Sequence, residues 1–289
     1  MTPRRRATLA GFAAVLLWSS LAVLTTATGA IPPFQLLAMG FGIAGLAGAA
    51  LVLRPGGPGA AALRQPWAAG LLVIGALFGY HALYFLALKR APAVEANLIN
   101  YLWPLLIVVF AAMSGGTRVR AAQWVGTALG LAAAVLLVTR GHSLQINPAH
   151  LPGYAAALGA AVIWALYSVL NRRFEAVPSA AMAGACLVVG ALGGMAHLAF
   201  ETTVAPTPWQ WALITALGLG PTGIAFWLWD IATKRGDLAT LGTLSYAAPL
   251  LSTGLLLAFG RATPHWTQPV AVALLLAGAW LSLSAAPEN

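Results

Sequence analysis

Ten apolar stretches of about 20 residues fill this chain almost from end to end, with only short breaks between them. A helix needs about 20 residues, at about 1.5 Å each, to cross a hydrocarbon core of about 30 Å. Charged residues make up only 7% of the 289, against about 25% in soluble domains. The sequence therefore predicts an all-α integral membrane protein with ten transmembrane helices. They are expected at roughly 7–25, 33–53, 67–88, 93–113, 121–139, 153–171, 179–200, 209–232, 237–259 and 266–284.

Two segments of the chain carry the same pattern at a distance of 145 residues. "KRAPAVEANLINYLWPLL" at 89–106 and "KRGDLATLGTLSYAAPLL" at 234–251 share Lys-Arg, a tyrosine at the thirteenth place and Pro-Leu-Leu at the end. "AAVLLWSSLAVL" and "GAAVIWALYSVL" likewise place Trp18 over Trp164. We therefore expect two five-helix repeats, over residues 1–145 and 146–289. Five is odd, so the second repeat enters the membrane from the other side, and the repeats are expected to be inverted.

Basic residues are distributed unevenly over the loops of this arrangement. If the arginines at positions 4–6 hold the N-terminus in the cytoplasm, eleven of the fifteen lysines and arginines fall on the cytoplasmic side. This bias is the one that the positive-inside rule expects, and it predicts that both termini are cytoplasmic. The net charge of +9 is then mostly an orientation signal, and we expect no nucleic-acid partner. The other four basic residues are Lys89, Arg90, Arg140 and Arg261.

This organisation resembles the drug/metabolite transporter superfamily, in particular its ten-helix branch built from two EamA-type repeats. The resemblance covers essentially the whole chain. It rests on the five-plus-five plan, the tryptophan in the first helix of each repeat and the paired junctions between third and fourth helices. More narrowly, "NLINYLWPLLIVVF" at 97–110 with "FGYHALYFLALKRAPAVEA" at 78–96 is similar to bacterial aromatic amino acid exporters of that superfamily. The resemblance implies a multi-pass transporter of the bacterial inner membrane, working in the direction of export.

Polar and aromatic side chains in the middle of spans mark the candidate substrate site, because a polar group in hydrocarbon needs a partner or a wet cavity. The third and fourth spans carry most of them, and Tyr80 and Tyr84 share a helix face at i, i+4 spacing. The second repeat carries fewer. The candidates are Trp18, Tyr80, His81, Tyr84, Asn97, Asn100, Tyr101, Trp103, Trp164, Trp227, Ser245 and Tyr246.

Several candidates also have a purely structural interpretation. Trp18, Trp103 and Trp164 sit inside their spans, where they either line a cavity or pack between helices. His81 fits a neutral, hydrogen-bonded structural histidine as well as it fits a substrate contact.

Charged residues near the span ends are expected to form local pairs rather than to carry protons. Asp230 lies close to Lys234 in the sequence, and Glu95 lies close to Arg90.

Two prolines inside spans remove a backbone hydrogen bond each, so kinks and hinges are expected there. These are Pro104 and Pro249.

A site rich in Trp, Tyr and Asn but poor in charge suits a neutral or zwitterionic ligand. Aromatic faces attract an ammonium group by about 0.5–2 kcal/mol, and Asn and Tyr can bind both ends of an amino acid. A phosphorylated substrate would need Lys or Arg in the site. We therefore expect export of aromatic amino acids by alternating access, down a gradient, around a site near the midplane. Other amino acids or metabolites, a polyamine and a lipid are the alternative substrates.

An intramembrane enzyme is the rival from a different class. The sequence has no HExxH, no paired aspartates and no Ser-His pair at suggestive spacing. The single Cys186 excludes a disulfide and a thiolate metal site on count. We therefore expect no catalytic residue, no metal and no cofactor, and we expect the transporter to work as a monomer in the lipid bilayer.

Overall fold

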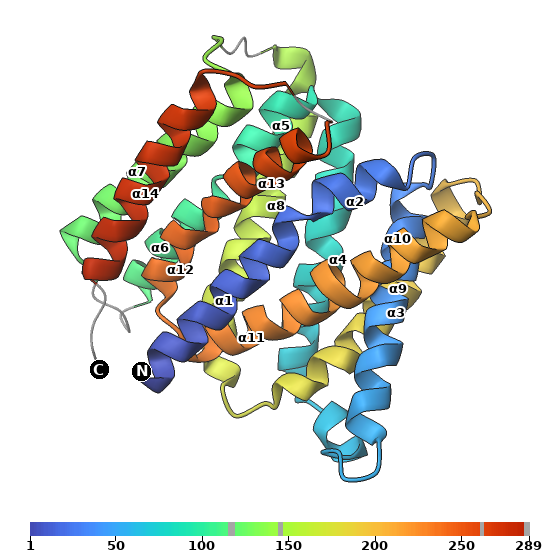
Figure 1. The fold of residues 1–289 in the computed structure, drawn as a ribbon. Coiled ribbons are helices and arrows are strands. Elements are labelled where there is room, and N and C mark those ends of the chain that lie inside the picture. Colours follow the sequence, from blue (N-terminus) through green and yellow to red (C-terminus); the bar gives the residue numbers. More distant parts are fainter. Residues whose placement is uncertain (115–118, 144–146, 261–262, 286–289) are drawn as a thin grey trace.

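The computed structural model describes residues 1–114, 119–143, 147–260 and 263–285, and these fold as a bundle of helices (Figure 1). No strand occurs among the described residues. The helices form ten spans that are long and apolar enough to cross a membrane. The predicted all-α membrane protein with ten spans is therefore confirmed. Arg118, Arg261 and the predicted repeat boundary at 145 and 146 lie outside the described residues.

Most spans lie where the sequence predicts them. The predicted bounds 33–53, 93–113, 121–139 and 179–200 are reproduced to the residue. The largest extension is Pro148–Phe174, which continues beyond the predicted 153–171 because a 3-10 turn is added at each end. Ten is an even number, so the start of the first span and the end of the last lie at the same face, here called the N-terminal face.

The helices, in chain order and with the labels of Figure 1, are α1 (Pro3–Ser19), α2 (Leu21–Ala27), α3 (Pro33–Leu53), α4 (Trp67–Arg90), α5 (Ala93–Asn100), α6 (Trp103–Met113), α7 (Ala121–Thr139), α8 (Leu151–Leu170), α9 (Met182–Phe200), α10 (Pro208–Leu219), α11 (Ala225–Arg235), α12 (Leu238–Ser245), α13 (Ala247–Ala258) and α14 (Thr267–Ser284). Prolines open α1, α3 and α10, where the missing N–H has no helical partner to lose. Asp237 caps α12 by accepting a hydrogen bond from the Thr240 N–H at 2.7 Å.

Four spans are interrupted. Pro104 is the second residue of α6 and Pro249 the third of α13, so the spans break just before each proline. A proline cannot donate to the carbonyl four residues earlier, which explains both breaks. The first span breaks at Ser20, whose hydroxyl donates to the Leu17 carbonyl at 2.7 Å and so competes with the helix. A π-helix, Gly220–Ile224, separates α10 from α11.

Each span of the first half packs along a span of the second half. The pairs are α1 with α11, α3 with α9, α4 with α8, α6 with α12 and α7 with α14. Figure 1 shows α7 and α14 side by side at one edge of the bundle. A Cβ on Gly126 would lie 2.5 Å from the Gly278 carbonyl, so glycine allows these two backbones to touch.

Candidate functional site

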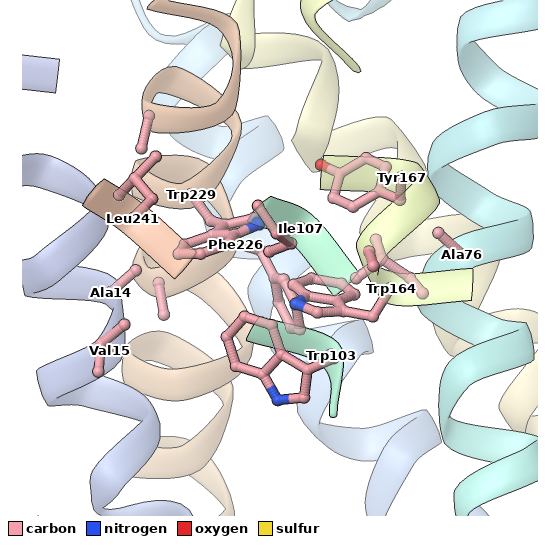
Figure 2. Packing of buried hydrophobic residues seen from close by; sticks show 14 of the residues in the cluster. Ala14, Val15, Ala76, Trp103, Ile107, Trp164, Tyr167, Phe226, Trp229 and Leu241 are labelled. Carbon is pink, nitrogen blue, oxygen red and sulfur yellow. The ribbon is translucent and has the colours of Figure 1, made fainter. Parts of the chain in front are cut away.

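Six aromatic rings meet inside the bundle and form what we call the aromatic cluster. They come from α1, α4, α6, α8 and α11 and are Trp18, Tyr80, Trp103, Trp164, Phe226 and Trp229. Trp164 is the centre, with its ring centroid 5.5 Å from that of Trp18 and 5.6 Å from that of Tyr80. Figure 2 shows Trp103, Trp164, Phe226 and Trp229 gathered between the helices. The structure thus brings together four of the rings that the sequence predicts.

Small neighbours and polar partners make this gathering possible. Ala14, Ala161 and Ala225 are fully buried, so the helices that carry the rings approach closely. A buried indole N–H needs an acceptor. Trp18 Nε1 donates to the Pro221 carbonyl at 3.0 Å, within the π-helix, where carbonyls are freed from the regular pattern.

A second group of side chains, the polar strip, links α4 to α5 beside the cluster. Asn100 Nδ2 donates to the Tyr80 hydroxyl at 3.1 Å, and the Tyr84 hydroxyl donates to Asn97 Oδ1. The Tyr80 and Tyr84 rings are stacked with centroids 5.9 Å apart. Asn100 is 5% exposed, yet its Oδ1 accepts no hydrogen bond within the described residues. Buried acceptors are nearly always paired, so this oxygen is available to a donor on a ligand.

His81 has the surroundings of a structural histidine. Its Nδ1 lies 2.6 Å from the Leu77 carbonyl of the same helix. Its ring stands edge-on to Phe41 at 5.4 Å and to Tyr80 at 5.2 Å. These contacts hold the ring beside the cluster, and both interpretations of His81 stay predictions.

Trp227 is not in the cluster. It is 47% exposed on the outside of α11, whereas Trp229 is fully buried and its Nε1 donates to Ser168 Oγ at 3.1 Å. Residues two apart on a helix face nearly opposite directions. The prediction that Trp227 points into the bundle is therefore wrong, and Trp229 is the α11 tryptophan that lies in the aromatic cluster. Phe226 shares the inner face of α11 with Trp229 at i, i+3 spacing, and both were missed.

A signal for the inner face of α11 was present in the sequence. Asp230 and Thr233 follow Trp229 at one and four places, and both are buried. Polar residues avoid lipid, so they mark the side of the helix that faces protein.

Three further candidates stand apart from the cluster rings. The Ser245 hydroxyl donates to the Leu241 carbonyl of its own helix at 2.7 Å. Tyr246 packs against α7, because a Cβ on Gly130 would lie 2.5 Å from its ring. Tyr101 directly follows α5 as its C-cap and is partly exposed.

Two groups of buried charges lie at the N-terminal face, away from the polar strip. Asp230 pairs with Lys234 at 2.8 Å, as the sequence predicts, and both are about 5% exposed or less. Asp237 pairs with Arg4 at 2.6 Å and accepts a hydrogen bond from Gln123 Nε2 at 3.2 Å. The contacts of Asp237 with Arg4 and Gln123, here called the Asp237 network, join α1, α7 and α12.

The predicted pairing of Glu95 with Arg90 is corrected. Glu95 instead accepts a hydrogen bond from the Tyr154 hydroxyl, which ties α5 to α8 on the face opposite the N-terminal one. Within the described residues, no group of three or more His, Cys, Asp or Glu is placed to hold a metal ion.

Comparison with known proteins adds independent findings. The EamA-like transporter family matches this chain twice, over residues 5–139 and 151–284. The aromatic amino acid exporter YddG of Ancylobacter novellus is 50% identical over 277 residues, which are 96% of each chain. A probable terminal-alkyne amino-acid exporter of Streptantibioticus cattleyicolor is 28% identical over 92% of this chain and 90% of that protein. A crystal structure of a protein 50% identical to this one covers 96% of both chains with a TM-score of 0.91.

Proposed function

Because the chain belongs to the EamA-like transporter family over nearly its whole length, we propose that it exports aromatic amino acids across the bacterial inner membrane. It is a multi-pass membrane protein with ten spans. The observation that carries the choice of substrate is the aromatic cluster beside an uncharged polar strip. The name of the relative from Ancylobacter novellus points to the same class of substrate.

The two parts of the site suit the two parts of an aromatic amino acid. Stacked and edge-on rings are worth about 0.5–1.5 kcal/mol each beyond the area that they bury, which favours an aromatic side chain. The unpartnered Asn100 Oδ1 is an acceptor for an ammonium group. Binding without a charged residue keeps affinity modest, which suits a carrier that must release its substrate.

We further propose that the two halves are inverted repeats that work by alternating access. The family matches each half separately, which supports two copies of one unit. The helix pairs support a twofold relation. The helices α1 and α11 belong to spans one and eight. Exchanging the halves turns span one into span six and span eight into span three, which contain α8 and α4. Both pairs of helices are in contact. The breaks before Pro104 and Pro249 are the proposed hinges.

We place the N-terminal face in the cytoplasm, following the positive-inside rule. The helices α5 and α12 are related by the 145-residue offset, and each has eight residues. All eight residues of α12 are buried, whereas only Ala96 and Asn100 of α5 are buried. With this orientation the asymmetry supports a conformation that is closed toward the cytoplasm and open to the outside.

Counterflow of labelled Phe, Trp and Thr in proteoliposomes tests the proposal. We expect Phe and Trp to exchange without a proton gradient. Asn100→Leu should weaken apparent affinity by about tenfold, the worth of a hydrogen bond to a charged group. Ser245→Ala is the matched control, because it changes the repeat-related position whose hydroxyl bonds only its own helix. Absence of aromatic amino acid counterflow would overturn the proposed substrate, and flux that stops when the proton gradient is removed would overturn the proposed energetics.

A further inference from the structure

An open apolar groove lies on the outer surface between α4 and α9, apart from the aromatic cluster. Its volume is about 630 Å³. Trp67, Gly70, Leu71 and Ile74 line it from α4, and Gly184 and Val188 line it from α9. The α4 residues recur at three and four places, so they form one stripe along the helix.

The position of the groove places it inside a membrane leaflet. It starts at the first residue of a span, at the N-terminal face. Trp67 is 81% exposed there, and tryptophan prefers the boundary between headgroups and acyl chains. Leu71 is 66% exposed one turn deeper. The groove therefore runs from headgroup level into the hydrocarbon.

Helix packing does not require the two glycines that shape the groove. A Cβ on Gly184 would lie 3.5 Å from the Leu63 carbonyl, and one on Gly70 would lie 3.6 Å from Gln65 Nε2, both ordinary contacts. By contrast, a Cβ on Gly45 would lie 2.7 Å from Leu187. The glycines at the groove leave space instead of permitting a close helix crossing.

Polar groups accompany the end of this apolar groove that lies at headgroup level, near Trp67. Arg64 does not line the groove itself, but it is exposed directly between Leu63 and Gln65, which both do. Gln65 lines the groove, and its side chain makes no hydrogen bond within the described part of the chain. A guanidinium binds phosphate through parallel hydrogen bonds, and an amide can donate to ester oxygens.

We propose that this groove binds one anionic phospholipid of the leaflet at the N-terminal face, with an acyl chain between α4 and α9 and its phosphate at Arg64. Charge complementarity selects the occupant, because a basic residue near a bilayer surface favours anionic over zwitterionic lipids by about fivefold.

Native mass spectrometry of the detergent-solubilised protein with phosphatidylglycerol or phosphatidylcholine tests this site. We expect the wild type to retain one phosphatidylglycerol, preferred over phosphatidylcholine by about fivefold. Gly184→Leu should abolish retention by filling the groove, and Arg64→Gln should remove the preference. The matched controls are Gly75→Leu, where a Cβ would meet nothing within 4 Å, and Arg90→Gln at the other end of α4.

Several results would overturn the lipid site. One is equal retention of both lipids by the wild type, and another is unchanged retention in Gly184→Leu. A protein dimer that Gly184→Leu dissociates would assign the groove to a second copy of the chain. Phe counterflow by the same variants should equal that of the wild type, because the groove lies away from the aromatic cluster. Failure of the lipid site and failure of the proposed function can therefore be told apart.

Discussion

Two tryptophans on α11 show how much a single residue position decides. Trp227 and Trp229 are equally apolar in the sequence, yet one is 47% exposed and the other fully buried. Hydropathy predicts that a span exists but not which face turns inward, because lipid and protein interior are equally apolar. The polar strip was easier to predict, since Asn and Tyr at mid-span are costly anywhere except against protein or a cavity.

The two tryptophans also provide a matched pair of variants. Trp229→Phe loses the hydrogen bond to Ser168 and leaves unfilled space in the cluster, so we expect a loss of roughly 1–3 kcal/mol in stability and slower counterflow. Trp227→Phe changes a lipid-facing ring and should alter neither. Thermal unfolding in detergent, with counterflow in parallel, measures both effects. Equal behaviour of the two variants would contradict the inward placement of Trp229.

Among the elements, the interrupted spans show which parts of the helical pattern are readable from sequence. The breaks before Pro104 and Pro249 were expected, because proline acts through a local backbone rule. The break at Ser20 and the π-helix, Gly220–Ile224, were not expected, because they depend on hydroxyl and carbonyl contacts made only in the folded bundle. Span bounds were well predicted, since composition and membrane thickness alone determine them.

Two glycines in the ninth span, Gly242 and Gly254, differ in how closely other helices approach them. A Cβ on Gly242 would lie 2.7 Å from the Pro104 carbonyl, so α12 and α6 cross at backbone contact. Gly242→Ala should force the two helices apart and lower the free energy of unfolding by about 1–3 kcal/mol, which is measured as a lower unfolding midpoint. Gly254→Ala, where nothing lies within 4 Å, should be neutral or stabilising by up to about 1 kcal/mol. Equal midpoints for the two variants would argue against a tight crossing of α6 and α12.

Across the whole molecule, polar contacts tie helices together at both faces, and at the face opposite the N-terminal one Glu201 accepts hydrogen bonds from the first turn of α3. The Asp237 network joins α1, α7 and α12, and the ion pair of Asp230 and Lys234 lies beside it. If the substrate is loaded from the N-terminal face, as we propose, the contacts of the Asp237 network must break in each cycle. A sequence shows the charges of such a network but not their partners, because Arg4 and Asp237 are far apart along the chain.

Removing one charge from this network should favour the state that is open at the N-terminal face. In a Cys186→Ala background, Thr243→Cys places a thiol on the buried α12, where a maleimide applied from that face reports opening. Asp237→Asn should raise the labelling rate by roughly tenfold, since it weakens charge-assisted hydrogen bonds worth about 1.5 kcal/mol or more.

Glu175→Gln is the matched control for the labelling experiment. It removes the ion pair with Arg235, in which both side chains are about 60% exposed and the separation is 3.7 Å. Exposed pairs contribute little, so its labelling rate should equal that of the parent. If Asp237→Asn also labels at the parent rate, the network does not hold this face closed.

Ribosomes deliver the first five spans before any of their partners exist. The helices α1, α3 and α4 enter the bilayer without α11, α9 and α8, and α6 and α7 without α12 and α14. Translation at about 5–20 residues per second separates the partners by on the order of ten seconds. During that interval the glycine-lined face of α7 meets lipid or the insertion machinery instead of α14. Because neither half buries its helices alone, assembly is completed only late in synthesis, and the emerging first half depends on its cellular surroundings for protection.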